Sequence, residues 1–286
     1  MIMKEEVQRI DLNDYVQTGE GGTAQAYTHK NGRTLAKLYN PGFEADRARK
    51  EFLTARTVFE LGIPTPEPYR MVTDGERSGA EYELIKGKRS FARIISQEPE
   101  RIEDISLTFA RMAKELHAKE ADTTTLKSMK EQVRRFYQTT DLVPETYRQK
   151  ALQFIDQVPE AATCLHGDLQ IGNIITDGKR TLWIDVGEFG YGVSEWDLGM
   201  LWTMAHRMGD QRAEFLFHIN HETFLAHWDI FFPAYLGTTD SQRIAEAERR
   251  LTAFASAKIP YMVDMVNHGR LPDEAYDSLI EFFGIK

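Results

Sequence analysis

The run HGDLQIGN at residues 166–173 constrains this chain more than any other stretch. It places Asp168 and Asn173 five residues apart, and Asp185 follows twelve residues later, after a strand-like run at residues 181–184. One carboxylate can accept the proton of an attacking hydroxyl, while an amide oxygen and a second carboxylate can hold magnesium, as phosphoryl transfer from ATP requires. The alternative is a turn whose polar side chains only cap backbone groups. The strand and Asp185 behind the loop favour the first interpretation, with Asp168 as base and Asn173 and Asp185 as metal ligands.

The composition indicates a folded protein that does not bind nucleic acid as its main partner. The 286 residues are 42% hydrophobic and 28% charged, and the net charge is -9. Phosphate backbones are bound by basic surfaces, so an acidic chain argues against them. An acidic surface mildly favours a cationic substrate, although solubility alone explains the same charge.

Neither a disulfide nor a membrane-spanning segment is expected. The single cysteine, Cys164, cannot form an internal disulfide, which fits a reducing compartment. No apolar stretch reaches the roughly 18 residues that span a bilayer. Charged side chains near the N-terminus interrupt what would be the apolar core of a signal peptide. We therefore expect a cytoplasmic protein with no membrane partner.

Residues 1–86 alternate short apolar runs with turn residues, a pattern typical of strands. One helix with apolar residues at near-helical spacing is expected at residues 44–61, ended by Gly62. The strands are expected at residues 12–16, 24–28, 34–39, 69–72 and 82–85. This predicts a small, mostly antiparallel lobe with one helix.

Helices predominate from about residue 91 onward. Helical spacing of apolar residues predicts them at residues 105–119, 147–158, 198–208, 213–236, 241–266 and 273–283. The fold class is therefore α+β, with a β-rich lobe at residues 1–86 and a larger, mainly helical lobe at residues 87–286. The boundary between the lobes is expected near Gly87.

A glycine-rich turn, TGEGGTAQAY, occupies residues 18–27 between two expected strands. Glycine lets backbone amides approach phosphates closely, so the turn is a candidate nucleotide-binding loop. Glycine-rich hairpins without ligands are common, and the turn alone is a weak signal. The candidate residues are Gly19, Gly21, Gly22 and Thr23.

A lysine on a later strand strengthens the nucleotide-binding interpretation. Lys37, in the apolar run LAKLY, can reach the phosphates of ATP as a point charge; otherwise it is an edge-strand lysine that faces water. Glu51, in the middle of the expected helix, is the preferred partner to fix this lysine. The adenine is expected against the segment from Glu83 to Ile85.

Two further groups have structural and functional interpretations. Asp197 is expected to cap the following helix or to brace the catalytic loop through backbone amides. The histidines and aromatic residues at 215–235 can cage a quaternary ammonium, but a helix core is the favoured explanation. Glu188, three residues after Asp185, is a further candidate contact to metal or substrate.

These motifs resemble those of the aminoglycoside phosphotransferase and choline kinase family. The resemblance is carried by GEGGTAQAY, LAKLY, ELGIPTPEPY, LHGDLQIGNII, LWIDVGEFGYG and WDLG, and it fades in the C-terminal helices. The likeness is greatest to bacterial members of undetermined activity. It implies a protein-kinase-like two-lobe fold with ATP between the lobes. It also implies that Asp168 is the base, that Asn173 and Asp185 bind magnesium, and that Lys37 contacts the phosphates.

The departures from the family patterns favour a small acceptor. Gln170 and Ile171 stand where many members have His-Pro, and His166-Gly167 replaces the His-Arg of protein kinases. The segment between Asp185 and Asp197 is too short for a phosphorylated activation loop. A small-molecule acceptor is therefore expected rather than a protein.

The sequence predicts an ATP- and magnesium-dependent kinase that phosphorylates a hydroxyl of an amino alcohol, an aminoglycoside or a sugar. Two alternatives remain: a nucleotide-binding pseudokinase that regulates a partner, and a transferase that moves AMP on the same fold. The presence of Lys37, Asp168, Asn173 and Asp185 argues against the pseudokinase. The oligomeric state is left open.

Overall fold

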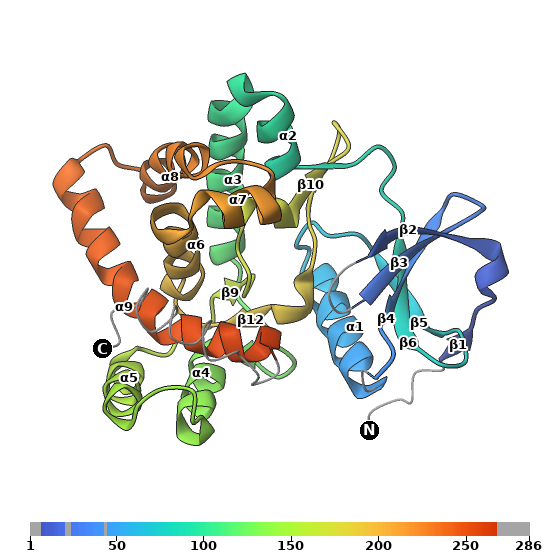
Figure 1. Cartoon of the computed structure of the whole chain (residues 1–286), viewed down its shortest axis with the longest axis horizontal. Helices are drawn as coiled ribbons and strands as arrows, with labels where there is room; N and C mark the ends of the chain where they lie inside the picture. Colours follow the sequence, from blue (N-terminus) through green and yellow to red (C-terminus); the bar gives the residue numbers. More distant parts are fainter. Residues whose placement is uncertain (1–6, 21–23, 43–44, 268–286) are drawn as a thin grey trace. The chain divides into compact units, whose positions relative to one another are not determined.

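The structure, a computed structural model, describes residues 7–20, 24–42 and 45–267 (Figure 1). The chain forms two compact units. The first comprises residues 1–90 and 173–189, and the second comprises residues 91–172 and 190–286. Residues 173–189 therefore pack with the N-terminal part of the chain, and the first unit is discontinuous in sequence. The division near Gly87 that the sequence suggested stays a prediction.

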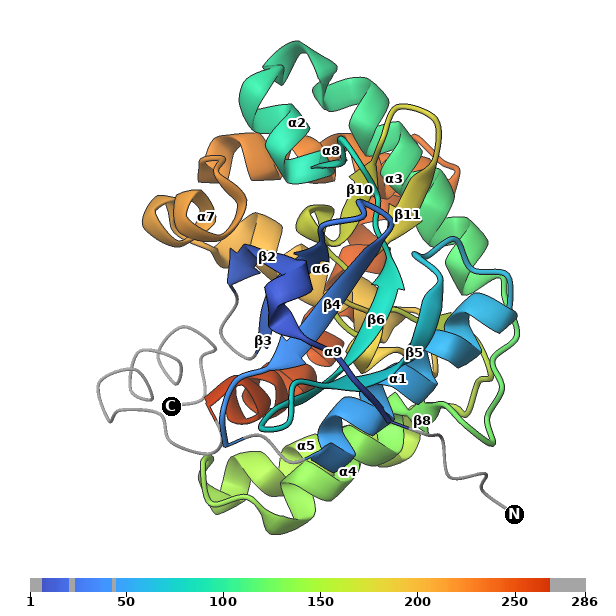
Figure 2. The same ribbon diagram turned by 90° about the vertical axis from the view of Figure 1, so that its right-hand side faces the viewer.

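The first unit is built on a six-stranded sheet with the order β1-β5-β6-β4-β3-β2 (Figure 2). Its strands are β1 (Gln8–Arg9), β2 (Tyr15–Glu20), β3 (Ala24–His29), β4 (Thr34–Tyr39), β5 (Pro68–Thr73) and β6 (Ser78–Glu83). All neighbouring pairs are antiparallel except β1 with β5. The expected small, mostly antiparallel sheet is confirmed.

Alternate residues of β4 face different apolar clusters, because successive side chains of a strand point to opposite faces. Ala36 and Leu38 pack in a cluster with Val72 of β5. Tyr39 packs in another cluster, with Phe52 of helix α1 (Ala45–Glu60). Helix α1 therefore covers the face of the sheet to which Tyr39, and by alternation Lys37, belongs.

A second, three-stranded sheet completes the first unit. Its order is β11-β10-β7, and its strands are β7 (Arg89–Ser90), β10 (Ile174–Thr176) and β11 (Thr181–Trp183). Ile175 and Leu182 of the β10–β11 hairpin pack with Ile85, the residue two after β6. The short 3-10 turn η4 (Val186–Glu188) follows the hairpin.

The second unit is mainly helical. It contains α2 (Phe91–Gln97), η2 (Pro99–Arg101), α3 (Ile102–His117), α4 (Met129–Thr139), α5 (Glu145–Gln157), α6 (Glu195–Arg207), α7 (Asp210–Phe217), α8 (His221–Leu236) and α9 (Ser241–Asn267). Three short strands, β8 (Lys127–Ser128), β9 (Cys164–Leu165) and β12 (Gly190–Tyr191), pair in the order β8-β12-β9. The 3-10 turn η3 (Ile171–Asn173) lies where the chain passes back to the first unit.

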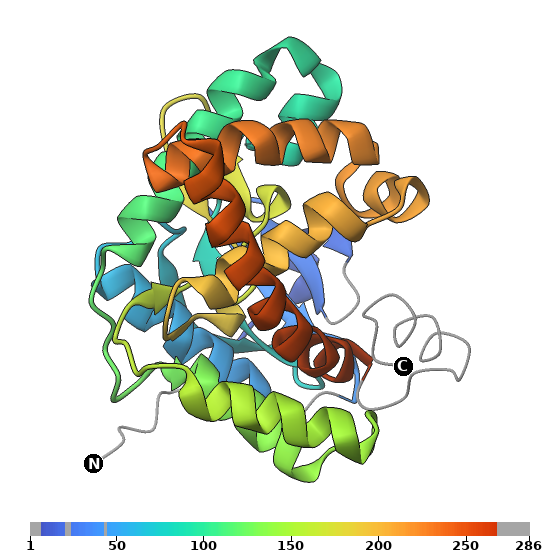
Figure 3. The ribbon, with the colours of Figure 1, turned by 90° about the vertical axis from the view of Figure 1, so that its left-hand side faces the viewer.

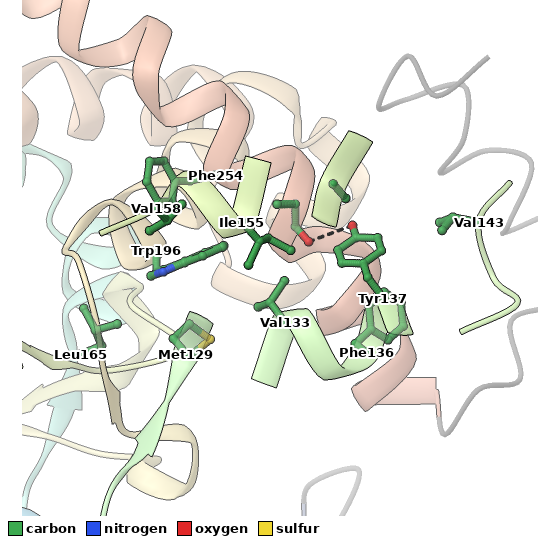
Figure 4. Packing of buried hydrophobic residues seen from close by; sticks show 12 residues of the cluster. Met129, Val133, Phe136, Tyr137, Val143, Ile155, Val158, Leu165, Trp196 and Phe254 are labelled. Carbon is green, nitrogen blue, oxygen red and sulfur yellow. Dashed lines mark hydrogen bonds between the residues drawn. The ribbon is translucent and has the colours of Figure 1, made fainter. Parts of the chain in front are cut away.

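Helix α9 packs against α6 and also contacts α4, α5 and α8 (Figure 3). One cluster of buried residues joins α4, α5 and α9 to Trp196 near the start of α6 (Figure 4). Within it, the hydroxyl of Tyr137 donates a hydrogen bond of 2.9 Å to the carbonyl oxygen of Ala257. This packing fixes the first turn of α6 against the C-terminal helix.

The starts of β2 and β6 differ most from the sequence-based expectation. Residues 12–14 form the 3-10 turn η1 (Leu12–Asp14), because the side chain of Asp11 accepts a hydrogen bond of 2.9 Å from the amide of Asn13. Strand β6 begins at Ser78 rather than at residue 82. Its Gly79 lies so close to β4 that an added β-carbon would be 1.9 Å from the carbonyl oxygen of Lys37. This close approach requires glycine. Because glycine is uncommon in strands, a search for β-branched and apolar residues does not detect the start of β6.

The single helix expected at residues 213–236 is divided into α7 and α8. His218 ends α7 with a φ of 59°, a left-handed conformation that a helix cannot continue. Asn220 then caps α8, since its side chain accepts a hydrogen bond of 2.8 Å from the amide of Thr223. The helix expected at residues 273–283 lies outside the described residues.

Candidate active site

Lys37 of β4 forms an ion pair with Glu51 of α1. The distance from Lys37 Nζ to Glu51 Oε1 is 2.7 Å, and the two side chains are 28% and 16% exposed. Tyr39, two residues after Lys37, donates a hydrogen bond to the other carboxylate oxygen, Glu51 Oε2. Glu51 is thus held on both oxygens by two residues of the same strand.

Lys37 also forms an ion pair with Asp185. Lys37 Nζ lies 3.3 Å from Asp185 Oδ1, and the Asp185 side chain is 59% exposed. The backbone of Asp185 has a φ of 57°, a left-handed conformation that is costly for most residues and clusters at functional sites. A candidate metal ligand therefore lies on a strained backbone two residues after β11.

The two carboxylates fix the charge of Lys37. Burial alone would lower the pKa of Lys37, but the negative charges of Glu51 and Asp185 outweigh burial and raise the pKa above its ordinary value. Lys37 is therefore a permanent cation near neutral pH, as a phosphate contact must be.

Because β10 pairs with β11, the backbone of Asn173 lies beside that of Ile184, the residue before Asp185. The amide of Ile184 donates a hydrogen bond of 2.9 Å to the carbonyl oxygen of Asn173. An amide oxygen and a carboxylate are hard oxygen donors, which suit magnesium. Among residues 7–20, 24–42 and 45–267, no group of three or more His, Cys, Asp and Glu side chains is arranged to hold a metal ion. The donor set fits a magnesium ion that takes its remaining ligands from phosphate and water.

Turn η4, which follows Asp185, contacts α1. A β-carbon added to Gly187 would lie 3.2 Å from Cγ, Cδ and Oε2 of Glu51. That separation is shorter than ordinary van der Waals contact, so a side chain at this position would press on the carboxylate. The absence of a side chain at Gly187 therefore leaves space for the Glu51 carboxylate beside Lys37.

Of the glycine-rich loop, Gly19 lies in β2, beside a register irregularity between Gln17 and Gly19. The other candidates of this loop, Gly21, Gly22 and Thr23, lie outside the described residues.

Both residues expected near the adenine contact the β10–β11 hairpin. Glu83 ends β6, and its Oε1 is 2.8 Å from an Nη2 atom of Arg180 in the hairpin turn. Ile85 is buried against Ile175 and Leu182. The segment expected against the adenine thus packs on the β10–β11 hairpin, which Asn173 precedes and Asp185 follows.

Asp168 belongs to the second unit, on the loop between β9 and η3. It is partly exposed, whereas Gly167 and Leu169 on either side are buried. The amides of His166 and Gly167 donate to Asp197 Oδ2 and Oδ1 over 2.7 and 2.9 Å. The expectation that Asp197 braces this loop through backbone amides is confirmed.

Asp197 is fully buried yet ionised. Burial would raise the pKa of Asp197, but a hydrogen bond from His117 and the positive charge of Lys258 outweigh it and lower the pKa to about 2. A stable negative charge therefore accepts the two loop amides, which strengthens both hydrogen bonds. Sequence reasoning found Asp197 but not the contributions of His117 and Lys258.

The aromatic residues of α8 form a helix core rather than an open cage. Trp228 and Phe232 are buried and stack with ring centroids 4.4 Å apart. His227 is also buried, with Nδ1 2.8 Å from Ser106 Oγ. The exception is Phe215 on α7, which is 80% exposed. The helix-core interpretation of this stretch is correct for the buried rings.

Comparison with known families places the chain among the phosphotransferases. The chain belongs to the phosphotransferase enzyme family (APH), whose profile matches residues 17–230. No curated protein matches the chain significantly in sequence. None of the helices in the described ranges has both the length and the apolarity needed to cross a bilayer.

Several solved structures are similar in fold. A choline/ethanolamine kinase family protein from Mesorhizobium loti has 14% identity over 94% of this chain and 85% of its own, with a TM-score of 0.57. Choline kinase LicA from Streptococcus pneumoniae has 16% identity, with 96% and 95% covered and a TM-score of 0.55. ADP-bound aminoglycoside phosphotransferase APH(2'')-Ib has 15% identity, with 99% and 94% covered and a TM-score of 0.59. The likeness confirms the α+β, protein-kinase-like fold class.

Proposed function

We propose that this protein transfers the γ-phosphoryl group of ATP to a hydroxyl of a small molecule. The observation that carries the proposal is the ion-paired group of Lys37, Glu51 and Asp185 in the first unit. Membership of the phosphotransferase enzyme family supports the reaction class. The ADP in the structure of APH(2'')-Ib supports an adenine nucleotide as donor.

ATP is proposed to lie under the loop that contains Gly19, Gly21, Gly22 and Thr23, with its adenine against the segment from Glu83 to Ile85. The buried position of Ile85 against the β10–β11 hairpin supports an apolar adenine surface. Lys37, held by Glu51, places its positive charge on the phosphates. Asn173 and Asp185 are the proposed magnesium ligands. The metal would neutralise the charge of the phosphates.

Asp168 is the proposed general base. It accepts the proton of the acceptor hydroxyl while the hydroxyl oxygen bonds to the γ-phosphorus. The bond from the γ-phosphorus to the bridging oxygen of ADP breaks, and ADP leaves with that electron pair. The partly exposed position of Asp168 between buried Gly167 and Leu169, on a loop braced by Asp197, supports this role. Positioning and charge neutralisation supply most of the acceleration.

The proposed acceptor is a hydroxyl of an amino alcohol, an aminoglycoside or a sugar. The similar structures include a choline/ethanolamine kinase family protein and aminoglycoside phosphotransferases. The net charge of -9 favours a cationic member of this set. A cytoplasmic location is proposed with it, in accord with the single, buried thiol of Cys164.

The test is ADP release from Mg-ATP with choline, ethanolamine, aminoglycosides, sugars and homoserine as acceptors. Asp168→Asn preserves shape and removes the base. We expect this variant to bind ATP normally and to lose turnover by about 100- to 10,000-fold. Asp141→Asn, on the exposed connection between α4 and α5, is the matched control and should keep full turnover.

The alternatives give different products. Release of pyrophosphate with a product heavier by an adenylyl group would replace phosphoryl transfer with AMP transfer. Tight ATP binding without turnover on any acceptor would favour a regulatory nucleotide-binding protein. Near-normal turnover of Asp168→Asn would remove Asp168 as the base.

A further inference from the structure

Lys258 of α9 is fully buried, with a relative exposure of 0%. Lysine is almost never completely buried unless its charge is paired. Its Nζ donates to the carbonyl oxygen of Gly167 over 2.6 Å and to that of Trp196 over 3.2 Å. The same atom lies 3.7 Å from Asp197 Oδ1. The ammonium group thus contacts both the loop that carries Asp168, between β9 and η3 (the catalytic loop), and the first turn of α6.

We propose that Lys258 is a positioning residue for Asp168, acting through the peptide group that joins Gly167 to Asp168. The inference rests on the proposed role of Asp168 as base. The carbonyl of Gly167 and the amide of Asp168 lie in one rigid plane. A hydrogen bond to that carbonyl therefore fixes the plane from which the Asp168 side chain departs.

The other side of Gly167 is fixed as well. Its amide donates to Asp197 Oδ1 over 2.9 Å, and its φ is 83°, in the region that favours glycine. Asp197 orients the peptide group before Gly167, and Lys258 orients the one after it. Asp197 and Lys258 together stabilise a backbone conformation at Gly167 that residues with a side chain rarely adopt.

The charges of this buried group also balance. His117 Nε2 lies 3.3 Å from Asp197 Oδ2, and His117 Nδ1 lies 2.8 Å from the hydroxyl of Tyr235. Both ring nitrogens of His117 therefore have a polar neighbour, and one of these neighbours is Asp197. Lys258 then supplies the positive charge opposite Asp197, as a buried carboxylate requires.

Stability alone does not explain a lysine here. An apolar side chain of similar length could fill the site, and replacing buried ions by apolar residues is often neutral for stability when both charges go. A lysine adds directed hydrogen bonds to the carbonyls of Gly167 and Trp196. These bonds specify a loop conformation, which is what a catalytic aspartate needs.

The helix that provides Lys258 lies beyond the residues that match the family profile. The family profile ends at residue 230, whereas α9 spans Ser241–Asn267. Helix α9 packs along α6, as Figure 3 shows. Under this proposal, α9 takes part in positioning Asp168 although it lies outside the matched residues.

The first experiment compares Lys258→Met with Tyr137→Phe. Tyr137 also makes a buried hydrogen bond to α9, at the neighbouring Ala257, but does not touch the catalytic loop. ADP release is measured with the acceptor from the panel that gives the highest rate. We expect Lys258→Met to lower kcat by about 100-fold, since small misplacements of a catalytic group cost this much. The KM for ATP should stay within about threefold, because the proposed ATP-contacting side chains lie in the first unit. Tyr137→Phe should keep kcat.

The second measurement does not depend on activity. Amide hydrogen exchange is followed in the peptide that covers residues 164–173, together with the free energy of unfolding. Lys258→Met should speed exchange in this peptide while its stability stays close to that of Tyr137→Phe. If Lys258→Met does not fold, it is combined with Asp197→Asn. The double variant lacks both buried charges. The combined variant should then show lower kcat and faster exchange than Asp197→Asn alone.

Unchanged kcat and unchanged exchange in a folded Lys258→Met variant would overturn the proposal. An equal fall in kcat for Tyr137→Phe would reduce the role of Lys258 to general packing. If the wild-type protein transfers no phosphate to any acceptor, the proposed function fails. The exchange experiment then still decides whether Lys258 orders the loop.

Discussion

The hydroxyl of Tyr39 donates a hydrogen bond to Glu51 on the oxygen opposite the one that Lys37 contacts. The two donors, Lys37 and Tyr39, occupy alternate positions of β4 and so lie on the same face of the strand. Each contacts one oxygen of the Glu51 carboxylate. Glu51 can then hold Lys37 in a single place. Tyr39 is thereby part of the proposed phosphate site through its hydrogen bond to Glu51.

Replacing Tyr39 with phenylalanine removes only this hydroxyl. We expect the Kd for Mg-ATP to rise by up to about tenfold, as the loss of a hydrogen bond to a charged group predicts. Calorimetric titration with Mg-ATP measures the change. Tyr15→Phe is the matched control, because the Tyr15 hydroxyl donates to Glu81 over 2.9 Å in a separate cluster of the same unit. Equal Kd values for wild type and Tyr39→Phe would show that Lys37 alone positions Glu51.

Gly187→Ala tests the space beside Glu51. The added methyl carbon would lie 3.2 Å from the carboxylate, so Glu51 must shift away from Lys37 or η4 must move. We expect a loss of about three- to tenfold in kcat/KM for ATP, from a displacement of a few tenths of an ångström. Gly209→Ala serves as control, since nothing lies within 4 Å of its added carbon. Equal kcat/KM in the two variants would contradict the proposed contact.

His227 should make stability depend on pH. Burial lowers the pKa of His227 from 6.5 to about 3, so the folded protein keeps the imidazole neutral while the unfolded chain protonates it near pH 6.5. The associated stability is fully present above pH 6.5 and is lost as the pH falls toward 3. Between pH 7 and pH 5 the loss is about 2 kcal/mol.

Urea unfolding of wild type and His227→Phe at pH 7 and pH 5 measures this loss. The variant keeps an aromatic ring, and Ser106 retains its hydrogen bond of 2.6 Å to the carbonyl oxygen of Ile102. Its stability should fall less over the same interval. His218→Asn replaces an exposed histidine and should keep the wild-type slope. Identical slopes in all three proteins would rule out a buried neutral His227.

Cys164 should react with thiol reagents only after unfolding. It is the one cysteine of the chain, it is fully buried, and burial raises the pKa of its thiol to about 11. At pH 8 the reactive thiolate is therefore scarce as well as inaccessible. Absorbance with an aromatic disulfide reagent should show no reaction in buffer and one thiol per chain in denaturant. Prompt reaction of the native protein would mean that β9 opens readily.

Local pattern was enough to locate much of the fold. Residues 34–39 were expected as a strand and form β4, because small and apolar residues surround Lys37 on both sides. The expected helix at residues 44–61 corresponds to α1. The start of β6 was missed because Gly79 serves a close backbone approach, which leaves no apolar signal. The break between α7 and α8 was missed because His218 adopts a conformation usual for glycine.

Sequence motifs identified Lys37 and Asp185, which lie 148 residues apart and form an ion pair, but not every residue around the site. The sequence predicted a strand before Asp185 and paired Asn173 with Asp185 as metal ligands, and the hydrogen bond from the amide of Ile184 to the carbonyl oxygen of Asn173 brings their backbones close. Lys258 is 91 residues from the carbonyl that it binds, and no periodicity reveals such a contact. A charged residue within the apolar spacing of α9 was the available signal, since burying a charge demands a partner.

The return of residues 173–189 to the first unit has a consequence for synthesis on the ribosome. Chains emerge N-terminus first, and domains usually fold in that order. Here the N-terminal unit lacks its β10–β11 hairpin until residue 189 has left the exit tunnel. By then residues 91–172 of the second unit have already been made. The side chain of Ile85 therefore lacks the hairpin residues that cover it, Ile175 and Leu182, until that whole segment has been translated. The first unit can therefore be completed only after the first part of the second unit has been synthesised.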